Sequence, residues 1–489
     1  SLLFFAIFWV LAARFGLGST AESTTVSDLG VPLMEWQIIY TCGLLAAAWL
    51  ACNAAAALGL FKKNLSTKEQ RWLDLALFLV IWLLAVLIWL RQPIPQNNYF
   101  APQQLPPNYE TYPFSDAQRY SLDALQFLFG DTRAEIVSKP MFILFLAALH
   151  GLGGVDYERV VFFQTLILAL FPAVLYLIGK KLGSRMLGLS ASLLAIFREV
   201  NFIQASDIAN VSNSKLLMTD FPYTLGISLL AFATIGWLQK KKERSLSLIL
   251  IGGLLAINCL LRPQTLILVP FYALLALIRN WKDWKRVITA FGVIAMILLL
   301  TISPLLVRNY VVGQYFWFDA PSYMSKFASS YALSNITEDE DFSEAASPAA
   351  DAAQPAGSML ALFSAGNSKL MTGIANNFFR NLLSAFLQFP VRALPSIPLQ
   401  EYKAIQENFW AHMGVYDHPL NYLLALLNCV LFALGIERLW RHDSRVLAAL
   451  LGLFACISLS TALFRFSGWR FIMPVDWIFY FLYLRGFLG

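Results

Sequence analysis

Residues 72–91, WLDLALFLVIWLLAVLIWLR, decide the fold class of this chain. Apart from Asp74 near one end and Arg91 at the other, the stretch is apolar, and a helix of about 20 such residues crosses the hydrocarbon core of a bilayer. Similar stretches recur along the 489 residues, of which 58% are hydrophobic and 13% charged, and the mean hydropathy is +0.61. Soluble proteins carry about a quarter charged residues. The composition therefore excludes a soluble enzyme and a disordered chain, and predicts a polytopic integral membrane protein.

Runs of this kind predict an all-α fold with about twelve transmembrane helices. The run 139–153 is short for a span, so we expect an interfacial or re-entrant helix there. The expected spans are residues 1–17, 34–61, 72–91, 158–179, 187–203, 222–239, 246–260, 264–279, 287–306, 418–437, 446–463 and 473–488.

Basic residues form five short clusters between the apolar runs. If the helices alternate, all five fall on one side of the membrane, which the positive-inside rule assigns to the cytoplasm. The net charge of +6 is thus explained without nucleic acid, and we expect no nucleic-acid partner. The clusters are Lys62, Lys63, Lys68 and Arg71; Lys180, Lys181 and Arg185; Lys240, Lys241, Lys242 and Arg244; Arg279, Lys282, Lys285 and Arg286; and Arg438, Arg441 and Arg445.

The external side then carries 92–157, 204–221, 307–417 and 464–472. Segment 92–115, rich in Pro, Asn, Gln and Tyr, is expected to be an irregular loop. The acidic stretch 338–356 is expected to be a mobile insertion, and the sequons at Asn210 and Asn335 match a pattern that is common by chance. We divide the chain into two extra N-terminal helices (1–71), a transmembrane core (72–315), an external region (316–417) and C-terminal helices (418–489).

The first external loop contains Asp116, followed by Tyr120 and Ala124 at helical spacing. This pattern predicts an amphipathic helix at the membrane surface, with Ser115 as its N-cap. Asp116 at the first helical position has two interpretations. Its carboxylate stabilises the start of the helix by interacting with the helix dipole, or it takes part in the chemistry of the protein. In the second case Arg119 and Tyr120 beside it are further candidate site residues.

A second polar cluster lies in the expected external turn 199–220 and includes Glu199, Asp207 and Asp220. Thr219 and Asp220 stand directly before a span with Pro222 in its first turn, a pattern also typical of helix capping. Carboxyl groups near a bilayer tend to have raised pKa values, which suits a general base. Both interpretations stay open at this point.

Three arginines, Arg262, Arg308 and Arg470, fall on the external side, which the positive-inside rule disfavours. A single interfacial arginine usually extends its charged end to water. Three together also suit an anion-binding clamp, because guanidinium groups bind phosphate through two parallel hydrogen bonds.

Taken in order, these motifs resemble those of the type C glycosyltransferases (GT-C fold), in the branch of the protein O-mannosyltransferases and aminoarabinose transferases. The motifs are the external Asp116 with Tyr120, Lys139-Pro140, Arg262-Pro263, Arg308-Asn309-Tyr310 and Arg470 before Pro474. The resemblance covers roughly 72–315 and 418–488. It implies an inverting transfer of a sugar from a polyprenyl-phosphate donor to a hydroxyl acceptor (protein, lipid or glycan) at the external face.

Carried over by motif, the resemblance makes Asp116 the general base and Asp220 the second acidic residue, where the branch more usually has Glu. Lys139, Arg262, Arg308 and Arg470 would surround the donor phosphate. The chain departs from the family in Ala117, where many members have a second acid. It also departs in the two helices before the core, which suit plain anchoring in membrane lipids or a surface for a partner subunit.

The scheme requires no cofactor, and we expect no metal site because no HExxH or CxxC pair is present. A divalent cation between Asp116 and Asp220 is the alternative. We expect a bacterial plasma (inner) membrane protein with a periplasmic active site. Two rival functions remain, a transporter or flippase for a lipid-linked solute and a non-catalytic structural subunit. Against transport, the sequence predicts no charged residue buried within a helix, and its polar residues gather at one face.

Overall fold

The fold comes from a computed structural model, which describes residues 31–58, 66–96, 100–130, 138–206, 211–240, 245–320, 368–389, 419–464 and 466–488. These residues form a helical bundle with one short hairpin, as expected for an all-α polytopic membrane protein. Eight of the helices are long and apolar enough to cross a membrane: 35–55, 67–90, 157–182, 185–205, 220–239, 263–280, 284–313 and 426–463. The predicted span 1–17, the acidic stretch 338–356, Asn210 and Asn335 lie outside the described residues.

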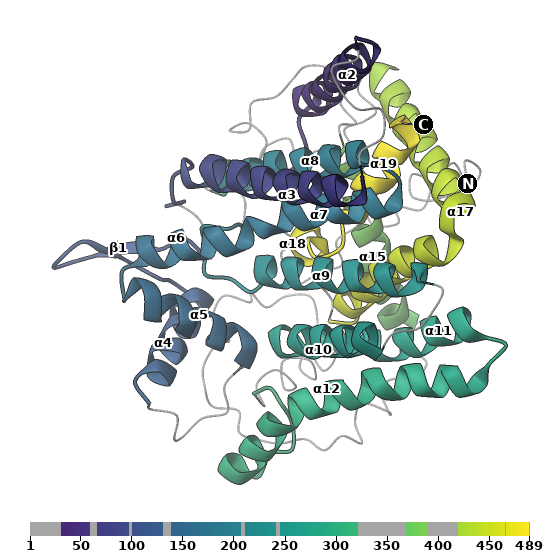
Figure 1. Ribbon diagram of the computed structural model, residues 1–489. Helices are drawn as coiled ribbons and strands as arrows, with labels where there is room; N and C mark the ends of the chain where they lie inside the picture. The colour runs from purple at the N-terminus through teal and green to yellow at the C-terminus, as the bar shows by residue number, and fades with distance from the viewer. Residues whose placement is uncertain are drawn as a thin grey trace.

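The long helices of the bundle lie side by side in Figure 1. Polar caps start several of them: Ser66 begins α3 with a capping box, and Ser184, Asp156 and Asp283 accept backbone hydrogen bonds at the starts of α8, α6 and α12. The bundle contains α2 (Glu35–Ala57), α3 (Thr67–Leu90), α6 (Tyr157–Leu168), α7 (Leu170–Leu182), α8 (Arg185–Ala205), α9 (Asp220–Gln239), α10 (Ser245–Leu261), η1 (Pro263–Ile267), α11 (Leu268–Asn280), α12 (Trp284–Gly313), α15 (Ser368–Leu387), α17 (Pro419–Leu463), α18 (Trp469–Ile472) and α19 (Ile478–Leu488).

The C-terminal part differs from the prediction. The predicted spans 418–437 and 446–463 are both found in α17, which is interrupted at Asp443, where the backbone is extended (φ −159°, ψ 94°). The predicted span 473–488 is wrong in its length, because α19 begins at Ile478 and has 11 residues. At 1.5 Å per residue, such a helix is too short to cross a bilayer. It is instead buried in the protein, and Gly435 on α17 and Gly486 on α19 let the two helices approach backbone to backbone.

The first external loop is more ordered than predicted. Strands β1 (Gln103–Leu105) and β2 (Glu110–Tyr112) form an antiparallel hairpin within the segment expected to be irregular, with Gln104 opposite Thr111. Helix α4 (Asp116–Leu128) then packs on α5 (Pro140–Gly153), the short apolar helix expected at this position. The hairpin, α4 and α5 lie together at the left end of the bundle in Figure 1.

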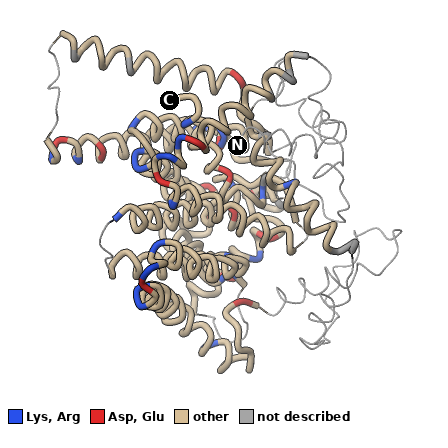
Figure 2. The backbone as a smooth tube through the Cα atoms, turned by 90° about the vertical axis from the view of Figure 1, so that its right-hand side faces the viewer, with Lys and Arg blue, Asp and Glu red and all other residues tan. Residues whose placement is uncertain are grey.

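The described members of the five basic clusters meet at the other end, which we call the basic end. Asp74 in the first turns of α3 pairs with Lys180 and with Arg185. Gln239 donates to the Lys181 carbonyl (3.1 Å), Arg279 to the Lys240 carbonyl (3.0 Å) and Arg438 to the Gly486 carbonyl (2.6 Å). Figure 2 looks onto this end and shows Lys and Arg at many of the helix ends. Within the described residues, these contacts support the predicted alternation of the helices. Lys62, Lys63, Lys241, Lys242 and Arg244 are not among them.

Candidate active site

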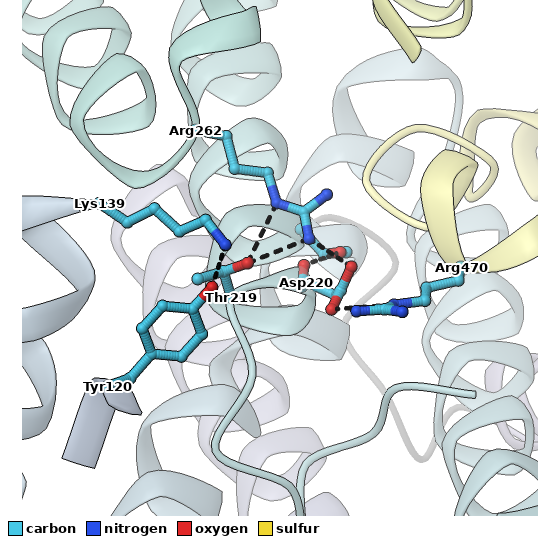
Figure 3. A network of polar contacts seen from close by, with 7 residues as sticks. Tyr120, Lys139, Thr219, Asp220, Arg262 and Arg470 are labelled. Atoms are coloured by element: carbon cyan, nitrogen blue, oxygen red, sulfur yellow. Dashed lines mark hydrogen bonds and ion pairs between the residues drawn. The ribbon is translucent and has the colours of Figure 1, made fainter. Parts of the chain in front are cut away.

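A cluster of buried and half-buried polar residues lies at the helix ends opposite the basic end, a position we call the site end. Asp220 is the first residue of α9, whose 20 residues separate it from Gln239 at the basic end by about 30 Å. Around it come Arg262 from the α10–η1 junction and Arg470 from α18. Tyr120 of α4 and Lys139, which precedes α5, complete the group (Figure 3).

Asp220 is the anionic centre of this cluster and is fully buried. Its Oδ1 accepts a hydrogen bond from Arg262 Nη2, and its Oδ2 lies 3.6 Å from Arg470 Nε. Arg262 also donates to Thr219 Oγ1 from Nε (3.2 Å) and Nη2 (3.0 Å). The two guanidinium groups therefore face one carboxylate, each at a different oxygen, as Figure 3 shows.

Local backbone geometry presents these cations. Arg262 precedes Pro263, which disfavours the helical conformation for the preceding residue, and Arg262 is extended (φ −148°, ψ 111°). Lys139 precedes Pro140 and takes a left-handed conformation (φ 53°, ψ 59°). Gly468, with φ 109°, turns the chain into α18, a conformation that a side chain would oppose. The X-Pro pairs seen in the sequence thus mark the turns that direct the cations inward.

Lys139 joins the cluster through Tyr120. Its ammonium group donates to the Tyr120 hydroxyl and lies 4.6 Å from the centre of the same ring. Burial and, to a smaller extent, the nearby Arg262 lower the pKa of Lys139 to about 8, against the opposing effects of Asp116, Asp220 and Asp319. Burial also raises the pKa of Tyr120 above its usual range. At neutral pH the lysine is therefore mainly charged and the tyrosine neutral.

Asp116 lies at the edge of this cluster and is exposed. As predicted it is the first residue of α4, one helical turn before Tyr120, and its charge contributes to the pKa values of both Tyr120 and Lys139. Ser115 occupies the predicted N-cap position, but with φ 55° its side chain makes no capping hydrogen bond. Asp116 alone supplies the favourable charge at this helix start.

The other predicted site residues differ in their burial and contacts. Arg119 is exposed on α4. Arg308 is half-buried on α12 and donates to Asn309 Oδ1 at 3.2 Å. Glu199, expected in an external turn, is instead buried within α8, where it accepts from the Ser214 amide at 2.6 Å. Asp207 lies outside the described residues.

Two buried aspartates, Asp319 and Asp476, are absent from the residues predicted from the sequence. Asp319 Oδ1 accepts from the backbone amides of Lys139 (2.8 Å) and Ala320 (2.9 Å) and so holds the left-handed turn before α5. Asp476 pairs with Arg198 inside the bundle. The prediction that no charged residue is buried within a helix is therefore wrong, because Arg198 lies in α8. Neither aspartate belongs to a local motif, so only the three-dimensional contacts reveal them.

Among the described residues, no group of three or more His, Cys, Asp or Glu side chains could hold a metal ion. The Asp220 carboxylate, one of the two groups considered for a divalent cation, faces Arg262 and Arg470. Because both guanidinium groups are in contact with this carboxylate, they would repel a metal cation bound to it. Asp220 therefore does not fit a divalent-ion site.

The site thus defines a membrane protein with buried and half-buried cations gathered at one end of its helices. No protein-family model and no curated protein matches the sequence. Among solved structures, the chain is similar to the archaeal oligosaccharyltransferase AglB from Archaeoglobus fulgidus, in complex with an inhibitory peptide and a dolichol-phosphate. The identity is 13% and the TM-score 0.44, over 86% of this chain and 50% of that chain.

Two further structures are similar. An apo oligosaccharyltransferase from Archaeoglobus fulgidus has 11% identity and a TM-score of 0.36, over 80% of this chain and 56% of that one. Apo ArnT from Cupriavidus metallidurans has 11% identity and a TM-score of 0.35, over 86% and 77%. The chain spans about half the length of the two oligosaccharyltransferases. AglB and ArnT are GT-C glycosyltransferases, the class that the sequence motifs resemble. At this degree of similarity, the function has to be argued from the chain's own residues.

Proposed function

We propose that this protein is a membrane glycosyltransferase that moves a sugar from a polyprenyl-phosphate donor to a hydroxyl group at the external face. The observation that carries the proposal is the gathering of Lys139, Arg262 and Arg470 around Asp220, with Asp116 one turn from Tyr120. The three cations come from parts of the chain that are far apart in sequence. Together they suit one phosphate group at the depth of the lipid headgroups.

The proposed reaction inverts the sugar configuration. Asp116 accepts the proton of the acceptor hydroxyl, whose oxygen attacks the anomeric carbon from the side opposite the phosphate. The bond between that carbon and the phosphate oxygen breaks, and the phosphodiester leaves as a phosphomonoester. The leaving group gains negative charge as the bond breaks, so buried cations beside it stabilise the transition state more than the ground state. A positioned base typically adds a factor of about 10²–10⁴ in rate.

Asp220 has a positioning task in this proposal. It is fully buried, and both of its oxygens face guanidinium groups. A carboxylate in that position orients Arg262 and Arg470 for the donor phosphate and offsets their mutual repulsion. Lys139 is the third phosphate ligand, and Arg308 stays a prediction as the fourth.

The positive-inside rule supports a proposed location for the site. The basic end would face the cytoplasm, and the site end would face the periplasm of a bacterial inner membrane. Nucleotide sugars remain in the cytoplasm, so an outward-facing transferase needs a lipid-borne donor. Mass spectrometry of lipids that co-purify with the protein is the direct test of this donor class. Recovery of a polyprenyl phosphate, free or glycosylated, is the expected result.

Replacing Asp116 by Asn tests the reaction itself. We expect transfer from a polyprenyl-phosphate sugar to fall by a factor of about 10²–10⁴, while binding of the donor lipid is retained. Asp123→Asn is the matched control, since Asp123 lies two turns further along the same helix, and it should leave the rate nearly unchanged. Wild-type turnover in the Asp116→Asn protein would remove Asp116 as the base.

One observation favours the transporter alternative, namely the buried Arg198–Asp476 pair inside the bundle. Charged residues within membrane helices often mark a transport path. Reconstituted vesicles separate the two functions, because a flippase would move a labelled polyprenyl-phosphate lipid between leaflets without an acceptor. We expect no such movement, and transfer of the sugar only when a hydroxyl acceptor is present on the external side.

A further inference from the structure

Two consecutive residues of α8, Arg198 and Glu199, place opposite charges inside the bundle. Only 4% of Arg198 and 3% of Glu199 is exposed. The proposed reaction uses neither side chain. Charged groups within the membrane are costly to bury and are usually retained for a function. The contacts of Arg198 and Glu199 indicate what that function is.

Arg198 is attached to the segment that carries Arg470. Its two terminal nitrogens donate to the two carboxylate oxygens of Asp476, one of them at 2.8 Å. Asp476 lies in the turn after α18, where its amide donates to the Ile472 carbonyl at 2.9 Å. Gln388 of the segment after α15 donates to the Asp476 carbonyl, also at 2.9 Å. The bidentate pair therefore fixes the short stretch from Arg470 to Asp476 against α8.

Glu199 is attached to the segment that carries Asp220. Its Oε1 accepts from the Ser214 amide at 2.6 Å. The buried loop 211–219 leads from there to Thr219 and Asp220, and further bonds hold it in place. Tyr157 donates to the Lys215 carbonyl (2.9 Å), and Gln164 donates to the carbonyls of Ser214 (2.8 Å) and Leu216 (3.0 Å).

One rigid helix thus holds the two segments whose ends meet in the site. Adjacent residues of a helix have a fixed separation, so the Arg198 and Glu199 contacts also fix the distance between the loop 211–219 and the turn after α18. Asp220 and Arg470 lie at the ends of these segments, with Arg470 Nε 3.6 Å from Asp220 Oδ2. This separation is too long for a good hydrogen bond, so the two groups do not hold themselves together tightly.

We propose that Arg198, Glu199 and Asp476 are positioning residues that set the separation of Asp220 and Arg470, and thereby the affinity for the donor phosphate. The inference rests on the proposed function, since it names the residues that shape the phosphate site. Replacing a buried ion pair by apolar residues often leaves a fold intact. If the pair has only a structural role, apolar replacements should therefore leave donor binding unchanged. If the pair positions the site, the same replacements should weaken donor binding.

The test is a set of variants assayed for donor KM, kcat and thermal stability in detergent. We expect Asp476→Asn to raise the donor KM by about tenfold or more, the scale of one hydrogen bond to a charged group, with a smaller change in kcat. Glu199→Gln keeps an oxygen that can accept from Ser214 and should change KM by less than about threefold. Glu199→Met removes that acceptor and should resemble Asp476→Asn.

Asp74→Asn is the matched control, because Asp74 is also a buried carboxylate with cationic partners but lies at the basic end. It should leave donor KM unchanged. The double variant Arg198→Met with Asp476→Leu serves if Asp476→Asn does not fold, and we expect it to be stable with a raised donor KM. A wild-type KM in the folded double variant would overturn the positioning role. If the wild-type protein neither binds nor consumes the donor, the proposed function itself fails, which is a separate outcome.

Discussion

A buried aspartate meets two cations at each end of this helix bundle. At the basic end Asp74 pairs with Lys180 and Arg185. At the site end Asp220 pairs with Arg262 and Arg470. Each group consists of one carboxylate and two basic side chains, and the groups lie at opposite ends of the bundle. The differences between their surroundings therefore indicate the role of each group.

The cations differ most in their contact with water. At the basic end 39% of the Lys180 side chain and 31% of the Arg185 side chain is exposed. At the site end the figures are 10% for Arg262 and 15% for Arg470. Asp74 Oδ1 also accepts from Arg185 Nε (2.7 Å) and the Tyr176 hydroxyl (2.8 Å), while Asp220 Oδ2 has its ion pair at 3.6 Å. Cations that contact water, such as Lys180 and Arg185, are stable without a bound ligand. Cations shielded from water, such as Arg262 and Arg470, need a neighbouring anion to offset the cost of their burial.

The largest expected effect is on stability. Asp220→Asn removes the negative charge between two buried guanidinium groups and should lower the free energy of unfolding by about 3–5 kcal/mol. Asp74→Asn should cost about 1 kcal/mol, because Lys180 and Arg185 can turn to water. Titration with SDS in mixed micelles measures both values. Equal losses for the two variants would remove the distinction between the ends.

The sequence predicts the fold class and most of the spans, because the length and apolar composition of a run such as 72–91 are enough to indicate a membrane-spanning helix. It fails at 473–488, where the apolar residues face protein rather than lipid, and at Glu199, whose surroundings come from a distant loop. Periodicity and hydropathy do not separate burial in lipid from burial in protein. The same limit hides Arg198 within a helix that reads as an ordinary span.

The candidate site is predicted in part for a related reason. Arg262 and Arg470 are recognisable because an arginine on the disfavoured side of a membrane is unusual, and Lys139 is recognised only through the resemblance, as the basic residue before Pro140. Asp319 has no such signal, and its role depends on the fold bringing the end of α12 and its following segment to the start of α5. Which residue pairs with Asp220 is likewise decided by tertiary contacts between separate helices.

A smaller effect concerns the charge of Lys139. Because burial lowers the pKa of Lys139 to about 8, the ammonium form that binds phosphate is present below that pH and is lost above it. Donor affinity should therefore decrease as the pH rises through 8. Lys139→Met should weaken donor binding by about 1.5–3 kcal/mol at neutral pH and remove the alkaline decrease.

Two variants control this prediction. Lys139→Arg keeps its charge at high pH, so its donor affinity should no longer fall above pH 8. Lys180→Met, which removes the cation beside Asp74 at the basic end, should leave donor affinity unchanged at every pH. Thermal shift against the polyprenyl-phosphate sugar, over a series of pH values, measures the donor affinity of both variants. An unaltered alkaline decrease in Lys139→Arg would show that another group titrates.

Arg308 tests how far the phosphate site extends beyond the cluster. Its side chain is half-buried and donates to Asn309 Oδ1 at 3.2 Å, so water screens its charge more than that of Arg262. We expect Arg308→Ala to weaken donor binding by about 1.5 kcal/mol, the low end for a hydrogen bond to a charged group. Arg441→Ala, at an exposed ion pair of the basic end, is the control. Unchanged affinity in Arg308→Ala would limit the site to Lys139, Arg262 and Arg470.

The smallest effect concerns Asp319, which links the electrostatics of the site to its backbone. Asp319→Asn keeps an oxygen for the amides of Lys139 and Ala320 but removes a negative charge that raises the pKa of Lys139. The pKa of Lys139 should therefore fall further, and the alkaline decrease in donor affinity should move to lower pH by less than about one unit, or about 1.4 kcal/mol. A pH series of donor affinity measures the shift. A move to higher pH would contradict the assignment, because removal of a nearby anion cannot stabilise the ammonium form of Lys139.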